Sequence, residues 1–262
     1  MTESRPLDNI AIYPKMHIPV ADRARSYWLQ ALASLRVPGA SVHVVGERET
    51  LQAICERRAS IARNGDGEME IILGRSIYFQ EYDPTLSSRL RAILKAATPQ
   101  FLVGIPNFDA HHITRASKRK SWERYRRLFS HLIDPTLEYH STAVSRPGSV
   151  VGLDHSKHYQ KFASIWAGRE LVLVHHADVS THPLFAGARR VHFVGCLAEH
   201  AFREYQPLLE RARAYVHLPD VVFAIAAGPT AGVLAWDLAQ AGVQALDVGH
   251  LTRAYDEFVQ MS

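Results

Sequence analysis

Short apolar runs alternate with longer, periodic segments along most of this chain. The runs hold four to six residues, are rich in Val, Ile, Leu and Ala, and lack the alternating polar positions of a half-exposed strand. We therefore expect buried strands at residues 41–45, 60–63, 101–105, 171–174, 191–194, 221–226 and 245–248.

Segments with apolar residues three or four positions apart separate these runs and predict helices. They cover residues 22–35, 49–57, 85–96, 121–133, 158–166, 199–213, 231–240 and 251–259. Non-alternating strands between helices are typical of a mostly parallel sheet with helices on both faces. We expect one α/β domain over residues 1–262, Rossmann-like in layout, with a wide irregular loop at residues 134–157.

Two carboxylates stand one residue apart just after the run at residues 60–63. Asp66 and Glu68 alternate with Gly65 and Gly67, whose missing Cβ atoms let a ligand approach the backbone. If the chain turns here, both carboxylates converge on one divalent cation, and Mg²⁺ or Mn²⁺ held in this way keeps sites for diphosphate oxygens. A tight turn with two solvated acids is the alternative, because short acidic motifs are common.

A glycine-proline-threonine segment follows the run at residues 221–226. Gly228, Pro229 and Thr230 lead into a predicted helix, whose first N–H groups and positive dipole end attract a phosphate. The alternative is a plain strand-to-helix turn in which Thr230 caps the helix. Because ligands of α/β sheets bind beyond the carboxyl ends of strands, this segment and Asp66 are both candidates for one site.

Two further segments carry charged or titratable groups at similar places. The run at residues 245–248 contains Asp247 and is followed by Gly249 and His250. One interpretation is that these residues bring a carboxylate and an imidazole near a nucleotide, and the other is that they form a capped turn. Arg146 lies in the wide loop. It is a candidate for neutralising a diphosphate leaving group, and the more common alternative is an arginine exposed at the surface.

Composition and missing motifs exclude several classes of protein. Hydrophobic residues make up 47% and charged residues 21% of the chain, as in an ordinary globular protein. A Gly-x-Gly-x-x-Gly motif, a P-loop lysine and a Gly-x-Ser-x-Gly elbow are absent from the sequence. No apolar run approaches the roughly 20 residues of a membrane span, and the polar N-terminus lacks a signal core, so we expect a cytoplasmic location.

Cysteine and histidine spacing gives no metal site. Cys55 and Cys196 are too isolated for a disulfide framework or a thiolate site. His175 and His176 are neighbours, and neighbours in an extended segment point to opposite sides, which makes them a poor chelate.

A basic segment lies between Arg115 and Leu132. Seven Lys and Arg residues up to Arg127 are opposed by Glu123 alone, within a chain of net charge +4. Trp122, Tyr125, Phe129 and Leu132 recur at helical spacing and predict an aromatic inner face. The segment suits contact with an anionic acceptor or peripheral contact with a membrane, or it is the solvated face of a core-packed helix.

Five of these segments, taken in chain order, resemble the GT-D-fold glycosyltransferases. The family shows Arg-aromatic-Gly-Asp-Gly-Glu, Phe-Gln-x-Tyr-Asp, Ser/Thr-Arg-Pro, Gly-Pro-Thr-Ala and Asp-Ile-Gly-His. Here Arg-Asn-Gly-Asp-Gly-Glu stands at 63–68, Phe-Gln-Glu-Tyr-Asp at 79–83, Ser-Arg-Pro at 145–147, Gly-Pro-Thr-Ala at 228–231 and Asp-Val-Gly-His at 247–250. The resemblance runs from about Glu49 to about Phe258, so residues 1–42 are an N-terminal extension outside it.

The resemblance implies metal-dependent transfer of a sugar from a nucleotide diphosphate donor, a UDP-sugar in the first place, to a glycan, glycoprotein or lipid-linked acceptor. It implies that Asp66 and Glu68 bind Mn²⁺ or Mg²⁺, a cation that stabilises charge growing on the departing diphosphate. His250 and Asp247 are the first candidates for a general base. The implied nucleotide-sugar-binding residues are Arg63, Gly65, Gly67, Gln80, Arg146, Gly228, Pro229, Thr230 and Gly249.

Two places depart from the family pattern and leave the donor sugar open. Asn64 replaces the aromatic residue, and residues 175–183 read His-His-Ala-Asp-Val-Ser-Thr-His-Pro where the family carries a Glu-Gly and a glycine-rich stretch. The alternatives are a metal-dependent phosphoesterase that uses Asp66 and Glu68, and a non-enzymatic module that binds polyanions or membranes through the basic segment. A nucleic-acid partner is not expected, and the oligomeric state is open.

Overall fold

One eight-stranded parallel sheet forms the centre of the fold. The computed structural model describes residues 24, 27, 28, 31, 43–108, 125–147, 150 and 152–261. Within these residues the strands lie in the order β1-β4-β3-β2-β8-β7-β5-β6, and every pairing is parallel. The predicted α/β class with a mostly parallel sheet is confirmed.

The short apolar runs gave the strand positions well. The strands β2 (Ser60–Arg63), β3 (Phe101–Ile105) and β7 (Val221–Ala226) have the predicted bounds. The others differ by a few residues at their ends, namely β1 (Val44–Val45), β5 (Glu170–His175), β6 (Arg190–Gly195) and β8 (Gln244–Asp247).

The expected irregular loop at residues 134–157 is wrong in large part. It contains β4 (Tyr139–Ser141), the 3-10 turn η1 (Thr142–Ser145) and the start of a helix at His155. This strand has three residues and no apolar run, so the hydrophobic pattern does not predict it. Backbone pairing with β1 and β3 holds it in the sheet. The buried Tyr139 also anchors it, because its hydroxyl donates to the Leu94 carbonyl at 2.8 Å.

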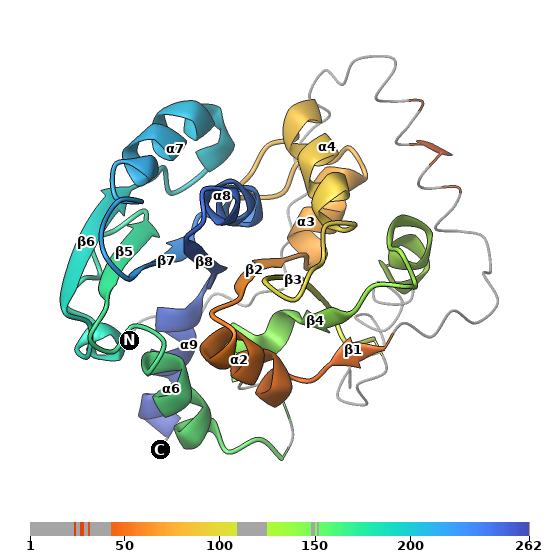
Figure 1. The fold of residues 1–262 in the computed structure, drawn as a ribbon. Coiled ribbons are helices and arrows are strands. Elements are labelled where there is room, and N and C mark those ends of the chain that lie inside the picture. The colour runs from red at the N-terminus through yellow and green to blue at the C-terminus, as the bar shows by residue number, and fades with distance from the viewer. Residues whose placement is uncertain are drawn as a thin grey trace, which may run out of the picture.

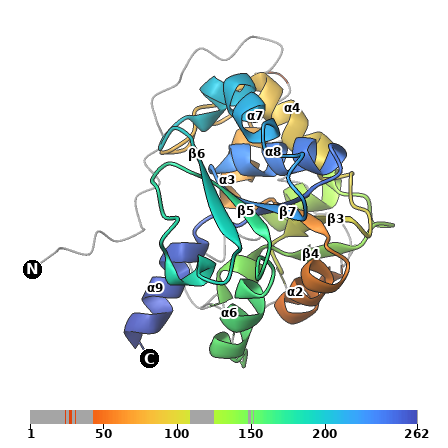
Figure 2. The ribbon, with the colours of Figure 1, turned by 60° about the vertical axis from the view of Figure 1, so that its left-hand side comes forward.

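Helices cover both faces of the sheet (Figures 1 and 2). One face carries α2 (Glu47–Glu56), α6 (His155–Ala163) and α9 (Leu251–Met261). The other carries α3 (Asp66–Ile72), α4 (Pro84–Ile93), α7 (Tyr205–Arg213) and α8 (Pro229–Gln240). No helix within the described ranges is long and apolar enough to cross a membrane.

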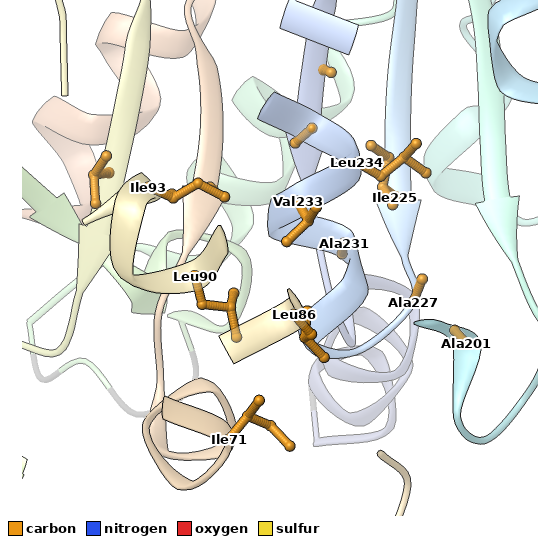
Figure 3. Packing of buried hydrophobic residues seen from close by; sticks show 14 of the residues in the cluster. Ile71, Leu86, Leu90, Ile93, Ala201, Ile225, Ala227, Ala231, Val233 and Leu234 are labelled. Atoms are coloured by element: carbon orange, nitrogen blue, oxygen red, sulfur yellow. The ribbon is translucent and has the colours of Figure 1, made fainter. Parts of the chain in front are cut away.

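Successive side chains of a strand point to opposite faces, so the sheet separates two hydrophobic cores. On β7, Phe223 and Ile225 join the core beneath α8, whereas Val222 and Ala224 join the core beneath α2 and α6. Figure 3 shows the first core, in which Leu86 and Leu90 of α4 lie near Val233 of α8. Packing between the sheet, α4 and α7 explains why α8 is apolar on most of its surface.

Several helices start or end differently from the prediction. Helix α8 begins at Pro229 rather than at residue 231, and the predicted helix at 199–213 is split into η4 (Ala201–Glu204) and α7. Helix α3 was not predicted at all. The predicted helix at 22–35 lies almost wholly outside the described residues, and of the one at 121–133 the described residues 125–132 are helical.

Candidate functional site

Three neighbouring strands bring the predicted motifs to one edge of the sheet. The strands β2, β8 and β7 lie side by side (Figure 1). Their carboxyl ends lead to Arg63, Asp247 and Gly228. Helix α8 crosses above them, since a Cβ atom at Gly232 would lie 3.5 Å from that of Ala62. The prediction that these three strand ends share one edge is confirmed.

Arg63 and the buried Asp247 form an ion pair between the ends of β2 and β8. The Arg63 Nη2 lies 3.1 Å from Asp247 Oδ1, and the backbone N–H of Arg63 donates to Oδ2 at 3.1 Å. Nη1 of Arg63 donates to the Thr142 carbonyl at 3.2 Å. The side chains are 15% and 4% exposed, and burial raises the pKa of Asp247 although Arg63 lowers it. This geometry suits a carboxylate that positions Arg63 better than one that takes a proton from a substrate.

Gly249 leaves the space that the Arg63 guanidinium occupies. A Cβ atom at this position would lie 1.8 Å from Arg63 Nη2, and the φ angle of +47° is one that residues with side chains rarely adopt. Both facts require glycine here. Gly249 therefore contributes to the site by making room for a cation.

The acidic motif begins a helix, and the open turn expected from the sequence is wrong. Gly65 is the N-cap of α3, so Asp66 and Glu68 occupy its first and third positions. Glu68 folds back and accepts the N–H of Gly65 at Oε2 over 2.7 Å, whereas Asp66 is exposed. Residues two apart on a helix point about 200° apart. Because Glu68 folds back over the helix start, it still lies close enough to Asp66 for the Asp66 carboxylate to raise its pKa.

The surroundings of Glu68 make its ionisation unfavourable. Burial, and after it the nearby carboxylates of Asp247 and Asp66, raise the pKa of Glu68 to about 7, against hydrogen bonds from the backbone. Glu68 thus has two further carboxylates as neighbours where β2 and β8 end.

We expect Glu68→Gln to stabilise the metal-free protein at alkaline pH. The folded pKa of about 7 lies above the ordinary 4.5, so the folded state holds this proton more tightly than the unfolded chain does. The stability from this group is complete below about pH 4.5 and is lost as the pH rises to about 7. The variant avoids this loss, so its free energy of unfolding at pH 8 should be on the order of 3 kcal/mol higher than that of the wild type.

Urea unfolding in EDTA at pH 5 and pH 8 measures the effect. Glutamine keeps an oxygen for the Gly65 N–H, so the change tests the charge rather than the cap. Glu56→Gln, on the exposed side of α2, is the matched control. A variant that is no more stable at pH 8 than at pH 5, relative to wild type, contradicts the prediction.

Buried side chains hold the start of α8 in place. Gly228 is its N-cap with a φ angle of +56°, and Pro229 is its first residue. The Thr230 side chain is buried and its hydroxyl lies 3.4 Å from Gln80 Oε1, so the alternative in which Thr230 caps the helix is wrong. Gln80 is buried too, and it links α8 to the turn before α4.

Several arginines lie near His250, just after β8. His250 is exposed, and its pKa is lowered first by partial desolvation and then by nearby positive charges, among them Arg146 and Arg63. His175, at the end of β5, contributes in the same sense. Its ring stacks on that of His176 with centroids 4.3 Å apart, which corrects the expectation that the two point apart, because β5 ends at His175.

The family model for the Glycosyltransferase GT-D fold matches residues 61–262, which include every one of these groups. The chain belongs to this family. Its sheet, helices and motif positions are thus those of a GT-D domain.

Known relatives and structures agree with this assignment. The GT-D chain is 31% identical over 83% of its length to the probable glycosyl transferase Gly of Streptococcus gordonii. It is 32% identical over 82% of its length to the glycosyltransferase GlyD of Streptococcus pneumoniae serotype 4. It spans 33% and 27% of these two proteins, about a third or less of each. A solved domain of unknown function 1792, described as having a distinct glycosyltransferase fold, superposes with a TM-score of 0.73 at 26% identity, covering 92% of this chain and 86% of that one.

The residue that departs from the GT-D motif is buried beside the site. Asn64 is 1% exposed, and its Nδ2 donates to the Gly104 carbonyl at a long 3.4 Å. Its Oδ1 finds no hydrogen-bond partner within the part of the chain that the structure describes. A smaller polar side chain thus fills the place of a ring, at the end of β2.

The C-terminal part of the basic segment, residues 125–132, can be placed in this GT-D chain. Residues 109–124 lie outside the described residues, and with them Arg115, Lys118, Trp122 and the other cations up to Arg124. Tyr125 and Phe129 are buried, which confirms this part of the aromatic inner face. The Tyr125 hydroxyl donates to Glu70 Oε1 at 2.6 Å, so the helix packs beside α3 and the acidic motif.

A cavity of about 550 Å³ lies at the opposite edge of the GT-D sheet. It is lined by the amino ends of β2, β3, β7 and β8 and by two arginines, Arg58 and Arg169, that pair with Asp220. None of the motif residues lines it. The candidate site is therefore the motif edge rather than this cavity.

Proposed function

We propose that this domain transfers a sugar from a nucleotide diphosphate donor, a UDP-sugar in the first place, to a glycan, glycoprotein or lipid-linked acceptor with the help of Mn²⁺ or Mg²⁺. One observation carries the proposal. Carboxylates from the start of α3, the cations Arg63 and Arg146, and the imidazole of His250 gather beyond the ends of adjacent strands. A cation bound to a diphosphate needs this pairing of opposite charges.

The residues fit a cation that is bound mainly by water and substrate. Asp66 and Glu68 are two carboxylates, and Mg²⁺ is commonly held by one or two carboxylates together with phosphate oxygens. The described residues hold no group of three or more His, Cys, Asp or Glu side chains placed for an ion. The negative charge that raises the pKa of Glu68 favours a cation at this position. When bound, the cation offsets charge on the departing diphosphate.

The chain's own cations would also hold the diphosphate. Arg63 is fixed by Asp247 and Thr142, so its guanidinium is preorganised rather than mobile. Arg146 and the positive end of the α8 dipole add to the same field. His250 is the better candidate for a general base, because its lowered pKa keeps the imidazole neutral at neutral pH.

We expect a nucleoside diphosphate to raise the melting temperature only when Mn²⁺ or Mg²⁺ is present. A ligand at about 100 times its Kd stabilises the folded state by about 2.7 kcal/mol. Asp66→Asn and Glu68→Gln should each remove the metal-dependent part of this shift. Thermal unfolding with UDP, with and without Mn²⁺, measures it, followed by a panel of nucleotide sugars assayed for hydrolysis.

Glu56→Gln on α2 is the control for loss of a surface charge. A shift of equal size in wild type and in both motif variants removes Asp66 and Glu68 from the site. Phosphate release from model esters, without turnover of any nucleotide sugar, would instead support a phosphoesterase.

A further inference from the structure

A turn between α3 and α4 presents two large aromatic side chains to solvent. Tyr78 is 54% exposed and Phe79 is 37% exposed. Large apolar side chains are usually buried, so a pair of exposed rings next to a candidate active site marks a surface for a ligand.

The ring of Phe79 lies against two glycines of the motifs. A Cβ atom at Gly228 would lie 3.0 Å from Phe79 Cε2, and one at Gly67 would lie 3.9 Å from Phe79 Cζ. The ring therefore bridges the start of α8 and the start of α3. Its position next to Gly67 also places it beside Asp66 and Glu68, the two carboxylates of the proposed cation site.

Hydrogen bonds on both sides hold this turn in place. Ile77 and Gln80 exchange backbone bonds of 2.9 and 3.3 Å, and the Phe79 carbonyl accepts the N–H of His200 at 2.8 Å. The N–H of Glu81 donates to His200 Nδ1 at 2.9 Å, and the Glu81 carboxylate pairs with Arg203. A ring fixed in this way loses little conformational entropy when a ligand stacks on it.

We propose that the exposed face of Phe79 stacks on the ring of the transferred sugar. This inference rests on the proposed function. In a nucleotide sugar, the ribose and the transferred sugar are each bonded directly to the diphosphate, whereas the nucleobase is separated from it by the ribose. A ring in contact with Gly67 is therefore next to one of these two sugars, and the transferred pyranose presents the broader C–H face to it. The C–H groups of a pyranose face form an apolar surface that packs on an aromatic ring.

The test compares the Kd of UDP with that of the nucleotide sugar that most stabilises the wild type, both with Mn²⁺ in isothermal titration calorimetry. Phe79→Ala should weaken binding of the nucleotide sugar about 5-fold and leave UDP unchanged, as expected for a stacking contact worth about 1 kcal/mol. Phe79→Tyr keeps the ring and should bind both ligands as the wild type does. Phe79→Leu keeps an apolar side chain without a ring and should resemble Phe79→Ala.

Two results overturn the inference. Equal weakening of UDP and the nucleotide sugar in Phe79→Ala indicates contact with the nucleobase or loss of the site's shape, and unchanged affinity for both excludes stacking. If the wild type binds neither UDP nor any nucleotide sugar, the proposed function fails first, and the inference falls with it. Circular dichroism and thermal unfolding of each variant confirm that it is folded before the comparison.

Discussion

Replacing Gly249 by alanine should displace Arg63 and reduce both stability and activity. The new Cβ would lie 1.8 Å from Arg63 Nη2, so the guanidinium has to leave its place between Asp247 and the Thr142 carbonyl. The φ angle of +47° adds a backbone penalty of about 1–2 kcal/mol. Leaving the Asp247 carboxylate buried without its partner adds more, so we expect the free energy of unfolding to fall by about 3–5 kcal/mol.

Gly242 offers a matched control for the backbone term. Its φ angle is +85°, and a Cβ there would meet nothing within 4 Å. Gly242→Ala therefore measures the cost of the left-handed conformation alone, and urea unfolding of both variants gives the difference due to Arg63. Equal losses in the two variants would show that Arg63 moves aside without cost, contrary to this account.

The sequence predicted the elements best where one physical signal was dominant. The apolar runs at β2, β3 and β7 could be located because burial on both faces demands continuous hydrophobic residues. The three-residue strand β4 has no such run, and its pairing depends on backbone groups that any sequence supplies. Helix α3 was missed because two glycines and two acids suggested a turn, although Glu68 at the third position of a helix capped by Gly65 is also a start signal.

The site could be predicted as a set of segments but not as a set of contacts. Motifs after β2, β7 and β8 had to share an edge, because parallel strands end on the same side. That Arg63 pairs with a residue 184 positions away depends on β8 lying next to β2, and no local pattern encodes the strand order. The position of the Phe79 ring over Gly67 and Gly228 depends equally on tertiary packing.

Asp247→Asn should test whether this carboxylate positions Arg63 or acts as the base. The amide cannot balance the guanidinium charge, so we expect the variant to lose about 3 kcal/mol of stability. If Arg63 is a preorganised donor to the diphosphate, kcat/KM should fall about 100-fold. Turnover of the nucleotide sugar identified in the binding screen, together with urea unfolding, measures both effects.

A double-mutant cycle with Arg63→Gln separates the two roles. Residues that act as one unit lose function non-additively, so positioning predicts that the double variant is no slower than either single one. It also predicts a pH profile of kcat/KM that is lower but unchanged in shape. If Asp247 were instead the general base, Asp247→Asn would remove the acidic limb of that profile. The fold-decreases in kcat/KM caused by Asp247→Asn and by Arg63→Gln would then multiply in the double variant. The carboxylate already accepts bonds from the Arg63 backbone and guanidinium, and for that reason we expect the first result.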